Sequence, residues 1–183
     1  MYKIFAIIGE LGVGKQDIVK TMSETYPSLF YSIPFYSTTK IFQGEEIDSK
    51  ELADKIIHGD ALTVFSNFYG FRASFWEDLK DDKINIGVFS PATVLQMSNE
   101  PLIELSIFYV SAKMNVQLVN LSKWEGWTLS QLVDLYQELN KDFKKYLNKK
   151  MLNECIMIVN DGSEKYKEIY KQLILNKVEE SYE

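Results

Sequence analysis

A glycine-punctuated turn near the start of the chain carries the residue types that hold phosphate. The apolar run 4–8 is followed by Gly9, four further residues, Gly14 and Lys15, with an additional Gly12 inside the turn. Glycine lets the backbone approach a phosphate closely and adopt positive φ angles. Amide N–H groups at the start of a helix favour an anion, and Lys15 adds a full positive charge. The pattern predicts a phosphate-binding loop between a strand and a helix.

One position departs from the usual pattern of such a loop. Gln16 stands where a Ser or Thr hydroxyl normally contacts Mg²⁺. The carboxylate of Asp17 can either bind the ion or its water, or be a first-turn acid that the helix dipole favours. A turn without a ligand is the plain alternative, which the strand pattern before it and the helical pattern after it disfavour. We expect the nucleotide to be bound by Gly9, Gly12, Val13, Gly14, Lys15, Gln16 and Asp17.

The charge composition excludes some classes of partner. The net charge of −6 argues against broad nucleic-acid binding, because affinity for the phosphate backbone comes from clustered Lys and Arg. Of the 20 basic residues only Arg72 is an arginine. Planar, bidentate recognition of phosphate is arginine chemistry. A phosphoryl-transfer site in this chain must therefore rely on lysine, on backbone amides and on Arg72.

Cysteine and histidine exclude further kinds of site. Cys155 is the only cysteine, which excludes an internal disulfide and a cysteine-based metal cluster, and its apolar surroundings predict a core position. His58 is the only histidine, so a zinc triad or a Ser-His-Asp hydrolase is hard to build, and a cap or surface role is expected. The N-terminal sequence lacks the pattern of a signal peptide or membrane span. We expect a cytoplasmic protein without a metal site built from its own side chains.

Alternating apolar and helical segments must position these residues. This order is typical of an α/β fold with a parallel sheet covered by helices. Strands are expected at 4–8, 30–35, 84–89, 105–110 and 155–159, and helices at 14–26, 91–98, 112–121, 130–149 and 163–176. A length of 183 residues fits a single domain.

Two segments interrupt this alternation. The polar segment from residue 36 onward, with a short helical stretch at 50–58, predicts an inserted substrate-side subdomain over about 36–81. The core would then comprise 1–35 and 82–183. A second break at 122–128 contains Trp124 and Trp127 and is interpreted as a lid.

Several segments, taken together, resemble guanylate kinases in order and spacing over most of the chain. They are the turn 9–15, Tyr-Pro-Ser-Leu-Phe at 26–30, Tyr-Ser-Thr-Thr-Lys at 36–40, Asn-Phe-Tyr-Gly at 67–70 and Ile-Val-Asn-Asp at 158–161. In that family the first loop holds the ATP phosphates and the third and fourth segments hold the GMP phosphate. An arginine-bearing lid closes over both. The resemblance implies a three-layer P-loop NTPase fold with a central parallel sheet, a small inserted monophosphate-binding subdomain and a short lid.

The resemblance also implies an acceptor site, in which several family residues are replaced. Lys40 and Gln43 stand at the places of two phosphate-binding arginines, while Ser37, Thr38 and Tyr69 keep hydroxyl groups, and Arg72 lies close by. The family reads guanine with two carboxylates. Ser90 stands at one of these places, and Thr63 or Asp60 at the other, depending on a gap. An unpaired buried donor costs about 1–3 kcal/mol, so these residues do not secure specificity for GMP. A deoxynucleotide other than dGMP is a further candidate acceptor.

The lid segment differs most from the family. It offers Lys123, Trp124, Glu125 and Trp127 where the family places arginines that stabilise the transition state. Loss of such an arginine can lower the rate about 10³-fold or more. A lysine-rich sequence that departs this far from its family suggests a phage or a similarly fast-evolving genome.

The leading hypothesis is a kinase that transfers the γ-phosphate of ATP to a nucleoside monophosphate, with GMP or dGMP as the family default. Lys15, Lys40 and Arg72 would be catalytic, and ATP and Mg²⁺ would be the cofactors. The substrate-side residues would be Ser37, Thr38, Lys40, Thr63, Tyr69 and Ser90. We expect nucleotide substrates, no nucleic acid or membrane partner, and a monomer or homodimer. One alternative is a guanylate kinase-like binding module that has lost transfer; another is a P-loop ATPase acting on a different partner.

Overall fold

The main sheet places the glycine turn at the end of its middle strand. A computed structural model describes residues 1–39, 44–67, 70–123 and 128–181. Within these residues the main sheet has the strand order β2-β7-β1-β8-β9, and all four pairings are parallel. The strands are β1 (Tyr2–Gly9), β2 (Phe30–Ser32), β7 (Ile84–Val88), β8 (Ile103–Ala112) and β9 (Ile156–Asn160). The turn that follows β1 therefore lies at the carboxyl edge of the sheet, where α/β folds bind ligands.

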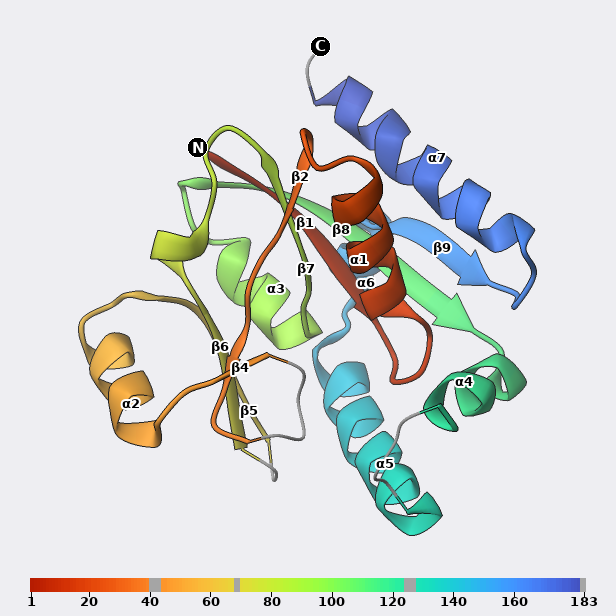
Figure 1. Ribbon diagram of the computed structural model, residues 1–183, viewed down its shortest axis with the longest axis horizontal. Helices are drawn as coiled ribbons and strands as arrows, with labels where there is room; N and C mark the ends of the chain where they lie inside the picture. Colours follow the sequence, from red (N-terminus) through yellow and green to blue (C-terminus); the bar gives the residue numbers. More distant parts are fainter. Residues whose placement is uncertain (40–43, 68–69, 124–127, 182–183) are drawn as a thin grey trace.

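Helices cover both faces of this sheet and form the outer two of three layers (Figure 1). One face packs against α1 (Lys15–Thr25) and α7 (Lys165–Glu180), and the other against α3 (Pro91–Met97), α5 (Leu129–Tyr146) and α6 (Lys149–Glu154). The helix α4 (Met114–Leu121) follows β8 at the carboxyl edge. The predicted α/β class with a central parallel sheet is confirmed.

The sequence of β1 explains why both faces are covered. Phe5 and Ile7 pack into the core under α1 and α7, whereas Ile4, Ala6 and Ile8 pack into the core on the α3 side. A strand that is buried on both faces requires a continuous apolar run instead of an alternating one. The apolar run before the glycine turn therefore indicated the central position of this strand.

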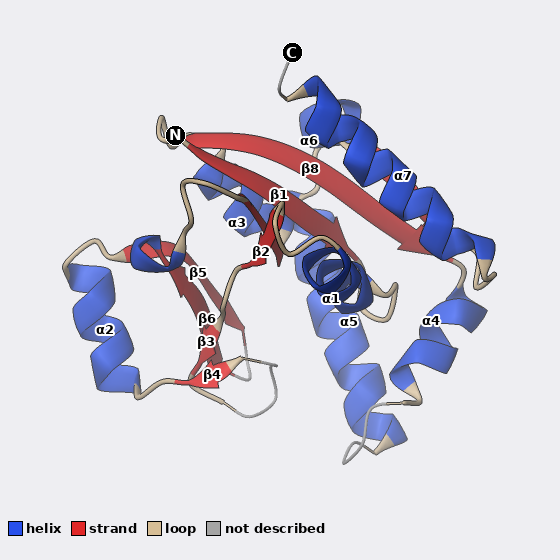
Figure 2. Ribbon diagram, turned by 45° about the horizontal axis from the view of Figure 1, so that its top comes forward, coloured by secondary structure: helices blue, strands red, loops and turns tan. Residues whose placement is uncertain are grey.

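A second, smaller sheet lies to one side of the main sheet (Figure 2). Its strand order is β4-β3-β6-β5, formed by β3 (Tyr36–Ser37), β4 (Glu45–Glu46), β5 (Ala61–Asn67) and β6 (Gly70–Phe75). The helix α2 (Ser49–Ile57) packs on it through a small core of Ile47, Leu52, Ala73 and Phe75, and the 3₁₀ turn η1 (Trp76–Asp78) leads back to β7. All of these elements lie between β2 and β7 in the sequence.

The four strands of the second sheet were not expected, whereas the elements of the main sheet differ from expectation mainly near their ends. The expected helix 130–149 is two helices, because α5 ends at Tyr146 and Asn148 starts α6 by accepting a hydrogen bond from Met151 N at 2.8 Å. The expected strand 30–35 is paired only over Phe30–Ser32. Residues 124–127 of the predicted lid lie outside the described residues. Among the residues described, no helix has the length and apolar character needed to cross a membrane.

Candidate functional site

The turn after β1 has a backbone that only glycine can follow. Gly12 and Gly14 have φ angles of 79° and 95°, in the left-handed region that side chains disfavour. Gly9 is required for a different reason, since a Cβ atom there would lie 2.3 Å from the carbonyl oxygen of Val110. A Cβ atom on Gly12 would lie 2.9 Å from the carbonyl oxygen of Gln117 on α4. The spacing of the glycines is thus set by backbone conformation and by packing against β8 and α4.

The helix α1 starts directly from this turn. Gly14 occupies the N-cap position and provides no side-chain hydrogen bond to the first turn. The first-turn amides of a helix have no partners within the helix, and the helix dipole makes this end positive. Gln16 and Asp17 are exposed beside these amides. The turn and the start of α1 together have the arrangement that binds anions.

Lys15 folds back into the turn. Its Nζ donates hydrogen bonds to the carbonyl oxygens of Gly9, at 2.7 Å, and Glu10, at 2.6 Å. Burial is the main cause that lowers the pKa of this ammonium group to about 7; the nearby charge of Arg72 lowers it further, and that of Glu10 opposes the shift. A polyanion beside Lys15 would favour the charged form.

Arg72 on β6 is the second cation of the site. Its guanidinium carbon lies 3.7 Å from the centre of the Phe35 ring, and Phe35 contacts Phe89 edge-on with ring centres 5.4 Å apart. The Nε atom of Arg72 is buried, and no described residue accepts a hydrogen bond from it. Burial lowers the pKa of Arg72 to about 10. A buried N–H group without an acceptor is costly, so this Nε–H group can still bind an anion.

The predicted acceptor-side hydroxyls take part in the structure of the second sheet. Ser37 donates to the carbonyl oxygen of Thr39 at 2.8 Å, and Thr38 accepts from the amide of Phe71 at 3.0 Å. Thr63 pairs with the hydroxyl of Ser74 at 2.9 Å, buried between the strands β5 and β6. Contacts of these hydroxyls with a substrate stay a prediction.

The remaining acceptor-side residues fall in different parts of the fold. Ser90 forms a capping box with Thr93 at the start of α3, so its hydroxyl is used by that helix. Lys40 and Tyr69 lie outside the described residues. Of the predicted catalytic residues, Arg72 lies near enough to Lys15 for its charge to lower the pKa of Lys15, and Lys40 is not among the described residues.

Three asparagines from distant parts of the chain bind the backbone of the turn. Asn120 of α4 donates to Gly12 O at 2.8 Å, and Asn160 at the end of β9 donates to Val13 O at 2.9 Å. Asn140 of α5 accepts a hydrogen bond from the amide of Leu11 at 3.3 Å. Asn160 lies in the segment 158–161, but no local pattern in the sequence indicated Asn120 or Asn140.

A metal ion would find few protein ligands here. The described residues contain no group of three or more His, Cys, Asp and Glu side chains that could hold an ion. Mg²⁺ in nucleotide sites is bound by phosphate oxygens, by several waters and by one or two protein groups. The exposed oxygens of Gln16 and Asp17 lie beside the turn and suit that limited role.

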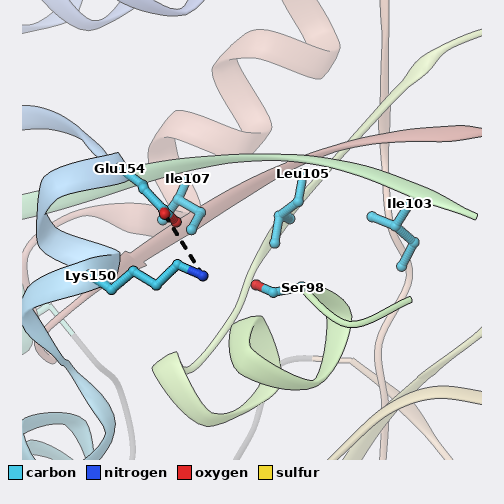
Figure 3. A pocket seen from close by; sticks show the side chains of 6 residues that line it. All are labelled: Ser98, Ile103, Leu105, Ile107, Lys150 and Glu154. Carbon is cyan, nitrogen blue, oxygen red and sulfur yellow. Dashed lines mark ion pairs between the residues drawn. The ribbon is translucent and has the colours of Figure 1, made fainter. Parts of the chain in front are cut away.

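One groove lies away from this site, at the opposite edge of the main sheet. It is lined by Ser98 just after α3, by Ile103, Leu105 and Ile107 of β8, and by Lys150 and Glu154 of α6, which form an ion pair at 4.0 Å (Figure 3). Ile103 pairs with Tyr2, at the start of β1, whereas the glycine turn follows the end of β1. The groove is therefore separate from the candidate site.

The architecture is shared with solved structures of very different sequence. It is similar to guanylate kinase from Anaplasma phagocytophilum, with a TM-score of 0.65 and 8% sequence identity, over 96% of this chain and 86% of that one. It is also similar to an uncharacterized protein from Eubacterium ventriosum ATCC 27560, with a TM-score of 0.51 and 15% identity, over 96% and 98% of the two chains. No family model and no curated protein matches the sequence. The chain thus has a guanylate kinase-like fold.

Proposed function

We propose that this protein is a nucleoside monophosphate kinase-like phosphotransferase, which moves the γ-phosphate of ATP to a monophosphate acceptor. The observation that carries the proposal is the turn after β1. Its left-handed glycines lead into the uncapped start of α1, and the Lys15 ammonium lies inside the turn. This combination of amides and a mobile cation suits a polyphosphate.

The donor phosphates would bind to the amides of residues 12–16 and to the Lys15 ammonium. When the triphosphate enters, Lys15 would exchange its two backbone acceptors, Gly9 O and Glu10 O, for phosphate oxygens. Mg²⁺ bound to the same phosphates would neutralise part of their charge. Gln16 and Asp17 would contact this ion directly or through its waters.

The acceptor phosphate would bind on the side of the second sheet. Arg72 is the guanidinium that can form a planar fork with it, and the Phe35 ring holds that guanidinium in place. The two cations, Lys15 and Arg72, are close enough to lower the pKa of Lys15, and a phosphoryl group between them would relieve their repulsion. Lys40 and Tyr69, with the hydroxyls of Ser37, Thr38, Thr63 and Ser90, complete the proposed acceptor side. Catalysis would come from alignment and charge stabilisation.

The test combines calorimetry with a turnover assay. ATP binding and coupled turnover are measured for the wild type with each ribo- and deoxyribonucleoside monophosphate, and then for Lys15→Ala. Lys20→Ala is the matched control, because Lys20 is an exposed lysine of the same helix and forms an ion pair with Glu24 at 4.0 Å. We expect Lys15→Ala to abolish binding and turnover and Lys20→Ala to retain both.

The other outcomes distinguish the alternatives. ATP binding without turnover for any monophosphate would favour a binding module that keeps the fold. Hydrolysis of ATP that no mononucleotide stimulates would favour an ATPase with another partner. A folded wild type that binds no triphosphate would contradict all three hypotheses.

A further inference from the structure

We propose that Asn120 and Asn160 act as positioning residues that fix the direction of the peptide groups in the glycine turn. The inference rests on the proposed function, because it assigns these side chains the task of pointing N–H groups at a bound phosphate. Neither residue need touch the ligand.

The argument starts from the geometry of a trans peptide, in which the C=O of one residue and the N–H of the next point in opposite directions. No peptide bond of the described chain is cis. Asn120 Nδ2 holds the carbonyl of Gly12 toward α4, at 2.8 Å, so the N–H of Val13 must point away from α4. Asn160 Nδ2 holds the carbonyl of Val13 at 2.9 Å, so the N–H of Gly14 must point away from the end of β9.

The peptide group between Glu10 and Leu11 has both of its polar groups bonded to side chains, so its N–H group does not face a ligand. Its carbonyl accepts a hydrogen bond from Lys15 Nζ at 2.6 Å, and its N–H donates to Asn140 on α5 at 3.3 Å. The turn is thus divided into two parts. The first part offers carbonyl oxygens to the ammonium group, and the second part offers N–H groups to an anion.

Close packing makes these contacts specific. Asn160 is 6% exposed, and a Cβ atom on Gly14 would lie 3.2 Å from its Nδ2 atom. The same Cβ atom would lie 3.9 Å from Asn120 Nδ2. A carboxamide donates through its nitrogen, whereas a carboxylate of the same size only accepts. An Asp at either position would place an acceptor against a carbonyl oxygen and favour rotation of that peptide.

The test is Asn120→Asp, compared with Asn120→Ala and with Asn99→Asp. Asn99 Nδ2 also donates to a helix carbonyl, Leu95 O at 2.9 Å, but at the far end of α3. We expect Asn120→Asp to weaken ATP binding at least about tenfold and Asn120→Ala to weaken it less, because Ala removes the donor without adding repulsion. Asn99→Asp should bind ATP like the wild type.

A second readout needs no nucleotide and separates the two proposals. The ¹⁵N–¹H signals of Val13 and Gly14 in the free protein should shift in Asn120→Asp and stay in place in Asn99→Asp. If the wild type binds ATP and Asn120→Asp binds it equally well, the positioning role is wrong and the proposed function stands. If the wild type binds no triphosphate, the proposed function fails, and unshifted Val13 and Gly14 signals would still overturn the positioning role.

Discussion

The glycine turn and the facing side of the second sheet differ in how their polar groups are used. In the turn, three asparagines and Lys15 satisfy carbonyl and amide groups at Gly9 to Val13, while the first amides of α1 have no side-chain cap. In the second sheet, the hydroxyls of Ser37, Thr63 and Ser74 bond to one another or to backbone, and Arg72 Nε has no partner among the described residues.

The two regions also differ in how firmly their polar groups are held. The turn is held by contacts from β8, β9, α4 and α5, so its shape is fixed before a ligand arrives. The second sheet offers one guanidinium whose direction is set by a single aromatic ring. Under the proposed function, the end that holds the donor would therefore be preformed for phosphate, whereas the end that holds the acceptor would be defined mainly by charge.

Replacement of glycine should affect the two regions unequally. Gly9→Ala places a Cβ atom 2.3 Å from the backbone oxygen of Val110, and Gly70→Ala places one 2.3 Å from the side-chain Cγ2 of Thr39. Backbone in a central strand cannot move aside, whereas a side chain at a loop can. We expect Gly9→Ala to lower the free energy of unfolding by about 3 kcal/mol and Gly70→Ala by about half as much. Urea unfolding measures the free energy of unfolding of both variants, and an equal loss would show that the two sites are equally rigid.

Nucleotide affinity should fall with rising pH if the Lys15 ammonium binds the phosphates as proposed. The free protein holds Lys15 with a pKa of about 7, so above this pH the group is mostly neutral and must take up a proton to face a polyanion. We expect affinity for ATP to fall by up to about tenfold per pH unit between pH 7.5 and 9, with uptake of about one proton. Calorimetry in two buffers of different ionisation enthalpy measures this uptake. Affinity that is constant over that range would contradict the role of Lys15.

The lowered pKa of Lys15 also predicts how the free energy of unfolding changes with pH. The folded pKa of about 7 lies below the unfolded value of 10.5, so the unfolded chain binds more protons between these values and stability rises with pH across that window. Lys15→Met should flatten this rise and stabilise the protein at pH 7. Urea unfolding at pH 7 and pH 9 compares the two proteins. If the free energy of unfolding changes equally with pH in both, the lowered pKa of Lys15 is contradicted.

Removal of Arg72 should separate stability from acceptor binding. Arg72→Met eliminates a cation whose pKa is lowered by burial and whose Nε atom has no partner among the described residues, and we expect the free energy of unfolding to rise by about 1 kcal/mol. Binding of the monophosphate should be lost in the same variant. Lys80→Met is the control, because Lys80 is an exposed cation 5.2 Å from the Tyr31 ring and should change neither quantity. A destabilised Arg72→Met protein that still binds acceptor would reverse this interpretation.

The smallest effect is expected for the hydroxyl pair of the second sheet. Thr63→Val or Ser74→Ala alone leaves one buried hydroxyl without its partner, at a cost of about 1 kcal/mol each. The double variant should cost less than the sum of the two, with a coupling of about 0.5 kcal/mol. A double-mutant cycle in urea measures the coupling. Additive losses would show that the pair does not hold the two strands together.

The central part of the fold could be predicted because its sequence signals are local. The apolar run of β1, the glycines and Lys15 are contiguous, and each of the expected strands 84–89, 105–110 and 155–159 overlaps an observed strand. Ser90 directly precedes the helix expected from Pro91, and its hydroxyl caps that helix; its contact with a substrate base stays a prediction.

The features that sequence reasoning missed depend on contacts between distant residues. Asn120 and Asn140 lie 108 and 129 residues from their partners in the turn, and neither belongs to a local pattern. The inserted segment was expected to carry one short helix, and the strands of the second sheet within it were not predicted, because their pairing joins residues from separate parts of the segment, such as Tyr36 with Ala73. Asn148 is a local helix-start signal that separates α5 from α6, although a single helix was expected over 130–149.

The path of the chain through the two sheets has an evolutionary consequence. The segment that forms the second sheet leaves after β2 and returns at β7, and these strands are neighbours, with Phe30 paired to Ile84. Both ends of the segment are thus anchored side by side. The whole segment could therefore be exchanged for another without changing the order of the main strands, so that under the proposed function the acceptor side could change while the glycine turn is kept.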